Sequence, residues 1–207
     1  MNRLLRSAGT LFVLLTVICI FVSPAQKKKT SAKKMPSQEE MMARWKEFMT
    51  PTDAHKKLEY FVGTWDMTTE AWMAGPNQPP ETSKGTATYS MILGGRYLQE
   101  NVSGEMMKMP FNGIGITGYD NFKKKYFGTW IDDMGTSVAT MEGTIDPDGK
   151  VITLWGKMDE PATGEKNKTV KYVYKIVDNN THLFEIYDVT SHGEKYPTMR
   201  VTYKRKV

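Results

Sequence analysis

Turn-forming residues divide the chain from Gly63 onward into short segments of strand-like alternation. These groups occur at 93–96, 119–121, 132–135, 146–149, 178–180 and 191–193. Their Gly, Asn and Asp residues tolerate tight or left-handed backbone, which is what strand connections require. The spacing predicts about ten strands, near 63–73, 83–93, 96–104, 112–119, 124–132, 136–145, 150–158, 167–178, 181–190 and 195–206. Such a series is typical of an up-and-down antiparallel β-meander.

The clearest alternation lies in segment 167–178. Its apolar residues share one face: Val170, Tyr172, Tyr174 and Ile176. Lys171 and Lys175 lie on the other face, so this strand should have one side in a core. No helical pattern interrupts the series, and consecutive strands must either close or leave exposed edges. We therefore predict an all-β fold, an antiparallel up-and-down barrel over residues 61–207.

The two ends of the series carry residues suited to closing the barrel. Arg205 shares a face of the last strand with Met199, Val201 and Tyr203. Antiparallel pairing with the first strand would bring Arg205 near Trp65. A guanidinium over an indole ring gains about 0.5 to 2 kcal/mol. We assign both residues a structural role in barrel closure.

A short amphipathic helix is predicted before the barrel. Ser37 and Glu40 have the spacing of a capping box. Apolar residues follow at helical spacing: Met41, Met42, Trp45, Phe48 and Met49. Pro51 should end this helix, and one further helical turn should follow within 52–60. We expect segment 37–60 to pack on the barrel, with a membrane-binding or partner-binding face as the alternative.

The N-terminal region has the composition of an export signal. Arg3 and Arg6 precede an apolar stretch at 11–22, and Ser23–Ala25 supplies small residues for signal-peptidase cleavage. We predict a signal peptide over 1–25, a lysine-rich disordered tether over 26–36, and export to the periplasm or the exterior. The alternative is an uncleaved membrane anchor, because five lysines follow the apolar stretch and two arginines precede it.

Charge and cysteine content limit the possible partners. All 23 acidic residues but only 21 of the 28 basic residues lie from Met35 onward, so this part carries a net charge of about −2. The basic character therefore belongs to the leader and tether, and no nucleic-acid partner is expected. We expect membrane contact only through the leader or tether, and a monomeric domain. The single cysteine, Cys19, lies in the leader, which leaves the mature domain without thiol chemistry.

Three motifs carry a family resemblance: LGGRYLQE at 93–100, PFNGIGITGYDN at 110–121 and YFGTWIDDMG at 126–135. Over 55–206 the chain strongly resembles a bacterial family classified as a domain of unknown function, and this resemblance implies a lipocalin-like (calycin) barrel with no known reaction. The segment FVGTW at 61–65 also resembles the opening strand of fatty-acid-binding proteins. Their inward R-x-Y pair is not matched, since Arg200 and Tyr203 are three residues apart.

A barrel of this size should enclose one small cavity. The candidate lining residues are Tyr89, Leu98, Glu100, Met107, Trp130, Asp132 and Tyr187. Glu100 should face inward with Leu98, and Asp132 with Trp130, because residues two apart share a face. A buried carboxylate needs a partner. We expect Glu100 and Asp132 to pair with Arg96 or a lysine; the alternative is that they bind a ligand's donor.

Other chemistry has weaker support in the sequence. The methionine-rich segment 105–110 suggests a flexible lid, with a Cu(I) site as the alternative. His182 and His192 lie near turns and should be solvated, and no metal-ligand spacing is present, so neither a metal nor a cofactor is expected. Nucleophile-elbow and P-loop motifs are missing from the sequence.

These observations favour an exported barrel that binds one small hydrophobic or amphipathic molecule without catalysis. Two alternatives stay open. One is an enzyme that uses Glu100 or Asp132 as an acid or base, and the other is a structural or interaction domain at the cell envelope. An unfilled interior would favour the ligand-binding barrel or the enzyme, whereas a filled interior would favour the structural or interaction domain.

Overall fold

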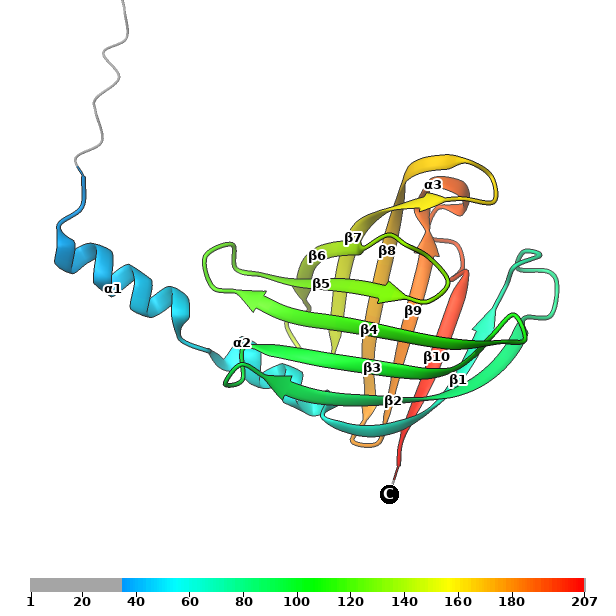
Figure 1. Cartoon of the computed structure of the whole chain (residues 1–207), viewed down its shortest axis with the longest axis horizontal. Helices are drawn as coiled ribbons and strands as arrows, with labels where there is room; N and C mark the ends of the chain where they lie inside the picture. The colour runs from blue at the N-terminus through cyan, green and yellow to red at the C-terminus, as the bar shows by residue number, and fades with distance from the viewer. Residues whose placement is uncertain (1–34, 207) are drawn as a thin grey trace, which may run out of the picture. The chain divides into compact units, whose positions relative to one another are not determined.

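The computed structural model describes residues 35–206 (Figure 1). The predicted signal peptide at 1–25 and nearly all of the predicted tether at 26–36 lie outside the described residues. The helical elements are α1 (Gln38–Met49), α2 (Asp53–Lys56), η1 (Lys57–Phe61) and α3 (Val189–His192). The strands are β1 (Gly63–Ala71), β2 (Glu81–Ile92), β3 (Tyr97–Met106), β4 (Met109–Asp120), β5 (Lys125–Asp132), β6 (Ala139–Ile145), β7 (Val151–Glu160), β8 (Glu165–Asp178), β9 (Thr181–Asp188) and β10 (Met199–Arg205).

The strands form one closed antiparallel barrel in which each strand pairs with its neighbours in sequence. The barrel is completed by pairing of β1 with β10, where Trp65 stands opposite Arg205. The predicted all-β, ten-stranded up-and-down barrel is therefore confirmed. Closure gives every strand two partners and leaves no exposed edge.

The strand boundaries differ from the predicted ones at several places, and two of the differences change the predicted loops. Strands β3 and β4 continue to a two-residue turn at Met107 and Lys108, whose φ angles are 50° and 61°. Segment 105–110, predicted as a methionine-rich lid, is thus mostly a hairpin with continuous strand pairing and not a loop, and its Glu105 and Met106 line the cavity described below. After β9 the chain forms the short helix α3 before β10 begins at Met199.

The segment before the barrel divides into two parts. Helix α1 begins with the predicted capping box, in which Ser37 and Glu40 exchange hydrogen bonds. None of the residues of α1 is buried, so the expected docking of its apolar stripe on the barrel is corrected. Helices α2 and η1 are different, since Leu58 and Phe61 are almost fully buried among the barrel core residues. Apolar packing on the barrel therefore belongs to 53–61, whereas the C-terminal end of α1 is held by hydrogen bonds from Asn121 and Arg96 to the backbone carbonyls of 47–50.

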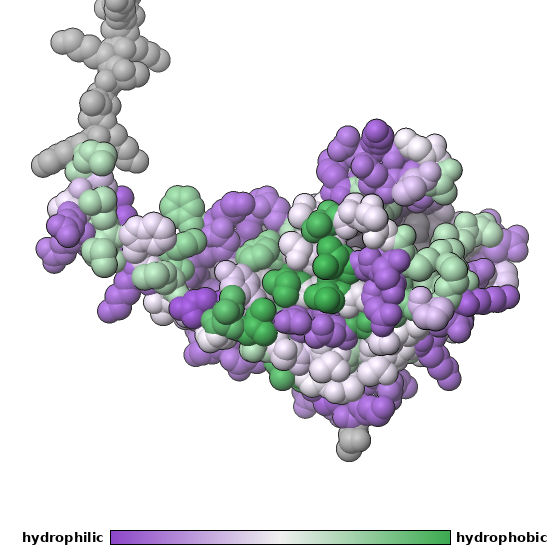
Figure 2. Space-filling model, in the orientation of Figure 1, coloured by the Kyte–Doolittle hydropathy of each residue, from purple (hydrophilic) through white to green (hydrophobic). Residues whose placement is uncertain are grey.

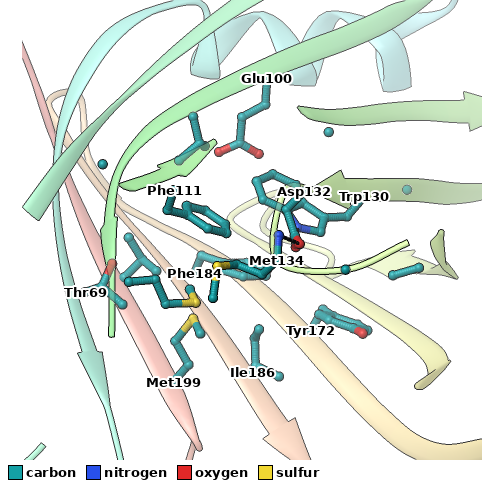
Figure 3. Close-up of a pocket in the computed structure, with 18 of the residues that line it drawn as sticks. Thr69, Glu100, Phe111, Trp130, Asp132, Met134, Tyr172, Phe184, Ile186 and Met199 are labelled. Carbon is teal, nitrogen blue, oxygen red and sulfur yellow. Dashed lines mark hydrogen bonds between the residues drawn. The ribbon is translucent and has the colours of Figure 1, made fainter. Parts of the chain in front are cut away.

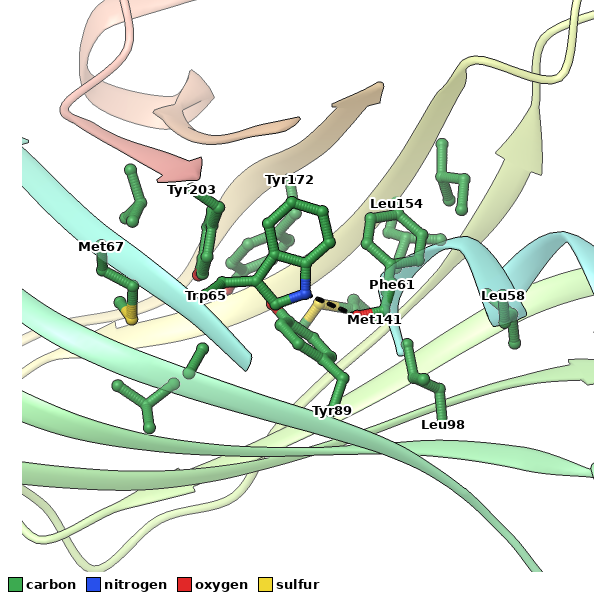
Figure 4. Close-up of a cluster of buried hydrophobic side chains, with 14 of the residues drawn as sticks. Leu58, Phe61, Trp65, Met67, Tyr89, Leu98, Met141, Leu154, Tyr172 and Tyr203 are labelled. Atoms are coloured by element: carbon green, nitrogen blue, oxygen red, sulfur yellow. Dashed lines mark hydrogen bonds between the residues drawn. The ribbon is translucent and has the colours of Figure 1, made fainter. Parts of the chain in front are cut away.

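Buried aromatic residues fill the end of the barrel next to η1 (Figure 4). The indole Nε1 of Trp65 donates a 2.7 Å hydrogen bond to the carbonyl of Phe61. The Arg205 guanidinium lies 4.0 Å from the centre of the Trp65 ring. It also donates to the carbonyls of Val62 and Tyr60 at 2.7 and 2.8 Å. One arginine thus joins η1, β1 and β10, and we call this region the closed end.

His182 belongs to the closed end, and the expectation that it is solvated is wrong. It is fully buried, stacks on Tyr203 at 4.2 Å between ring centroids, and meets the edge of Trp65 at 4.4 Å. Neither ring nitrogen has a hydrogen-bond partner among the described residues. Burial, together with the charge of Arg205, lowers the pKa of His182 to about 3. The imidazole is therefore a neutral member of an aromatic core.

On the face of the barrel that Figure 2 shows, apolar residues gather in an area over β4 and β5, with polar residues around it. Ile114 and Ile131 are directly paired there, and their exposed fractions are 43% and 45%. Across residues 35–206, none of the helices has the length and apolar character that crossing a membrane requires.

Candidate ligand cavity

A cavity of about 490 Å³ occupies the barrel interior away from η1 (Figure 3). Residues of all ten strands line it, including Met67 and Thr69 of β1 and Met199 and Val201 of β10, and Tyr203 separates it from His182 of the closed end. The apolar lining comprises Met67, Val102, Met106, Phe111, Trp130, Met134, Ala139, Met141, Met158, Tyr172, Tyr174, Phe184, Ile186, Met199, Val201 and Tyr203. Exposed lining residues such as Met134 show that the cavity reaches solvent at the end away from η1. Aromatic and thioether groups of this kind suit an apolar ligand body.

Two glycines on β4 make room for the cavity wall. A Cβ atom on Gly113 would lie 2.2 Å from the Trp130 ring. A Cβ atom on Gly115 would lie 3.2 Å from both the Trp130 ring and Glu100 Oε2. The PFNGIGITG motif therefore omits side chains where the indole of Trp130 and the carboxylate of Glu100 need space.

Glu100 is the buried charged group of the cavity, with an exposed fraction of 8%. Its Oε1 accepts hydrogen bonds from the hydroxyls of Tyr89 at 2.5 Å and Tyr203 at 3.3 Å. Its Oε2 has no hydrogen-bond partner within residues 35–206, and the carboxylate is directed into the cavity (Figure 3). One oxygen is thus held by two phenols while the other is free to accept from a ligand.

Burial sets the protonation of Glu100. Loss of solvation raises the pKa of this carboxyl to about 7, while the hydrogen bonds from Tyr89 and Tyr203 act in the opposite direction. Burial also raises the pKa of both tyrosines well above the ordinary range, and the charge of Glu100 adds to this effect. Near neutral pH, Glu100 therefore changes charge while its two donors stay neutral.

Asp132 lines the same cavity but has its oxygens occupied. Its Oδ2 accepts a 2.7 Å hydrogen bond from Trp130 Nε1, and its Oδ1 accepts a 3.0 Å hydrogen bond from the amide of Met134. This arrangement fixes the indole ring against the cavity wall (Figure 3). Asp132 therefore orients Trp130, whereas Glu100 retains a free acceptor.

The expected ion pairs of these two carboxylates do not form. Arg96 donates instead to the carbonyls of Met49 at 2.7 Å and Leu93 at 3.0 Å. Neither Glu100 nor Asp132 contacts a lysine or arginine among the ion pairs of the described residues. Phenol, indole and backbone donors take the place of cations, since the barrel interior brings them close enough.

The structure places Glu100, Trp130 and Asp132 on the cavity wall, and the remaining candidates elsewhere. Tyr89 lies behind Glu100 as its donor, and Leu98 is buried in the core between β2 and β4. The cavity roles expected for Met107 and Tyr187 are corrected.

Met107 is half exposed at the tip of the β3–β4 hairpin. Tyr187 follows Ile186, which faces the cavity, so strand alternation directs Tyr187 outward. There it donates to Glu185 at 2.9 Å and meets Lys171.

Sequence reasoning missed most of the aromatic wall. The alternation of β8 marks Tyr172 and Tyr174 as one inward face, and the alternation of β10 does the same for Met199 and Tyr203. The signal for their inward direction was therefore present. No pattern indicates that Tyr203 meets Glu100, 103 residues away in the chain.

Charged residues at the solvent end of the cavity are mainly acidic. The carboxylates are Glu105, Asp132, Asp159 and Glu160, and the cation is Lys84. Within residues 35–206, no group of three or more His, Cys, Asp or Glu side chains is arranged to hold a metal ion.

The fold and site define a class: a closed up-and-down β-barrel with an internal, mostly apolar cavity that contains a buried carboxylate. The chain belongs to the family described as "Protein of unknown function (DUF1579)", whose model matches residues 50–205. The match thus covers α2, η1 and the whole barrel.

Among solved structures, the chain is similar to a redesigned β-barrel at 15% identity and a TM-score of 0.38. The match covers 73% of this chain and 96% of that one. No curated protein matches the sequence.

Proposed function

We propose that the barrel binds one small hydrophobic or amphipathic molecule in its cavity and does not transform it. The observation that carries this proposal is an interior of about 490 Å³ that the protein's own side chains leave unfilled. Cavities that hold small molecules have volumes of roughly 300 to 1,000 Å³ and mainly apolar walls with few polar groups. A purely structural barrel would instead be filled by its own side chains at the density of an organic crystal.

A cavity-filling substitution tests this proposal. Ile186→Trp adds bulk on the cavity wall, while Tyr187→Trp adds an indole to the outer face of the same strand. With Nile red as an uncharged fluorescent probe, we expect the native chain and Tyr187→Trp to bind. Ile186→Trp should bind Nile red at least about tenfold more weakly, because the new side chain occupies cavity volume that the probe needs. Equal binding by all three proteins would refute the proposal, provided that circular dichroism shows them equally folded.

A second candidate is an enzyme in which Glu100 acts as an acid or base. It is favoured by one observation, the pKa of Glu100 raised to about 7 by burial, which suits proton transfer at neutral pH. Asp132 is the weaker choice because both of its oxygens accept hydrogen bonds. Turnover of a bound compound by the native chain and its loss in Glu100→Gln would support this candidate; unchanged ligand after long incubation supports the carrier.

We further propose that the chain is exported, with cleavage after Ala25 and a lysine-rich tether before the barrel. Support comes from the basic, apolar and small-residue regions of 1–25. Intact-mass measurement of protein from its own host tests it. A mature chain that begins at Gln26 is expected, whereas a full-length chain in the membrane fraction would favour the anchored alternative.

A further inference from the structure

We infer that the ligand carries a protonated amine on an apolar body, and that this amine binds Glu100 Oε2. The inference rests on the proposed function and adds the chemical class of the ligand. It follows from the hydrogen bonding of Glu100, the charges along the cavity, and the position of Trp130.

The first argument is charge balance around Glu100. Glu100 has an exposed fraction of 8%, and the donors to its carboxyl group are the two neutral phenols of Tyr89 and Tyr203. No lysine or arginine of the described residues forms an ion pair with it. An ionised carboxylate in an apolar interior is unfavourable without a positive partner. A cationic ligand would supply that partner.

The free oxygen fixes the kind of group that the ligand must present. Oε1 already accepts from both tyrosines, so Oε2 is the available acceptor. An ammonium group donates and does not accept, which matches an acceptor site. A ligand carboxylate would place its acceptor oxygen against Glu100 Oε2, which is also an acceptor, unless one of the two carboxyl groups is protonated.

The second argument comes from the charges along the entrance. Glu105, Asp159 and Glu160 line the cavity with Lys84 as their cationic neighbour. Carboxylates in excess attract a cation and repel an anion, and a cavity wall strengthens this field relative to open solvent. An amine would therefore meet favourable charge at the entrance and at the inner carboxylate.

The third argument is the position of Trp130 beside the free oxygen. Glu100 Oε2 and Trp130 Cε3 both lie 3.2 Å from one point, the Cβ position that Gly115 leaves empty. An ammonium group that binds the oxygen would thus lie next to the indole ring. Aromatic rings attract cations by a cation–π interaction. Phe111 and Met199 extend the apolar wall for the ligand body (Figure 3).

The pH dependence of binding distinguishes an amine from an acid. The titratable groups packed around Glu100 are Tyr89 on β2, Tyr174 on β8 and Tyr203 on β10, with His182 stacked behind Tyr203. Burial raises the pKa of all three tyrosines and lowers that of His182, so these groups stay neutral between pH 5 and 9. Only Glu100 among them then ionises within this range.

Matched ten-carbon probes test the inference on the full chain: decylamine, decanol and decanoate as competitors of Nile red. The pKa of an alkylamine is about 10, so decylamine stays protonated over this pH range. We expect decylamine to compete best, and its affinity to rise about tenfold or more from pH 5.5 to pH 8.5 as Glu100 ionises. Decanoate should bind more weakly as the pH rises over the same range.

Glu100→Gln supplies the decisive comparison, because the amide oxygen still accepts from the tyrosines while the charge is lost. Decylamine should then lose about tenfold in affinity and its pH dependence, while decanol is unchanged. Glu142→Gln, on the outer face of β6, serves as the matched control and should behave as the native chain.

Equal affinities for the three probes, tighter binding of decanoate, or no effect of Glu100→Gln would overturn the amine inference and leave the proposed cavity function intact. Failure of Nile red itself to bind the native chain would overturn both.

Discussion

The two ends of the barrel are built from the same strands but differ in how their interiors are filled. At the closed end, Trp65, Phe61 and His182 have exposed fractions of 3% or less and contact one another. At the cavity end, glycines such as Gly113 and Gly115 replace large side chains, and flexible methionines line the remaining space. Strand alternation selects the inward residues at both ends. Side-chain size and the insertion of η1 decide which end is solid.

Trp65→Ala should have the largest effect, because it removes the centre of the closed end. Trp65 has an exposed fraction of 0% and forms a hydrogen bond to η1. Truncating a buried aromatic residue costs about 3 to 5 kcal/mol. Urea denaturation should show this loss in the free energy of unfolding. A loss below about 1 kcal/mol would mean that the closed end is not the stable part of the barrel.

The pH dependence of stability should reveal both ends at once, through His182 and Glu100. The pKa of His182 falls from 6.5 to about 3 on folding, so the unfolded chain binds more protons and stability is lost as the pH decreases between these values. The pKa of Glu100 rises from 4.5 to about 7, so the folded chain binds more protons and stability is lost as the pH increases between these values. The contributions are about 5 kcal/mol for His182 and about 3 kcal/mol for Glu100.

The two windows overlap between pH 4.5 and 6.5, where the opposite slopes of His182 and Glu100 nearly cancel, so stability should be greatest across this range. Denaturation midpoints across pH 4 to 8 measure this. His182→Phe should remove the loss of stability below about pH 4.5, and Glu100→Gln should remove the loss above about pH 6.5, where only one of the two groups titrates. If a variant has the same dependence of the denaturation midpoint on pH as the native chain, the burial assigned to the substituted residue would be contradicted.

Sequence patterns predicted the barrel and its closure better than its contents. The turn residues after Gly63 marked the strands, since Gly, Asn and Asp report local backbone geometry. The pairing of Trp65 with Arg205 follows from closure of the first strand on the last. Turns depend on neighbouring residues along the chain, and the closing strand pair follows from the up-and-down order of the strands. Both can be read from sequence patterns.

The site depended on contacts that no local pattern contains. His182 lies beside a turn in the sequence, yet η1 covers it because Tyr60 and Phe61 insert at this end of the barrel. Glu100 was predicted to face inward, but its two tyrosine donors come from β2 and β10. Which polar groups meet inside a barrel depends on strand register across the whole sheet.

Arg205→Lys should have an intermediate effect at the closed end. The substitution keeps the charge but removes the planar guanidinium that stacks on Trp65 and donates to two carbonyls of 60–62. We expect a loss of about 2 kcal/mol, from hydrogen bonds and a cation–π contact that a lysine cannot reproduce together. Thermal unfolding measures it. Lys204→Arg, on the neighbouring exposed position, is the matched control and should leave the midpoint unchanged.

Met199→Ala should have the smallest effect, although Met199 is apolar and faces the barrel interior as Trp65 does. It borders space that is already empty and is only partly buried, so its removal enlarges an existing cavity instead of creating one in a packed core. We expect a loss below about 1 kcal/mol, together with weaker binding of Nile red because the ligand wall is reduced. Urea denaturation and probe titration on the same variant separate the two effects. A loss as large as that of Trp65→Ala would show that the cavity end is packed as tightly as the closed end, and the contrast between them would be wrong.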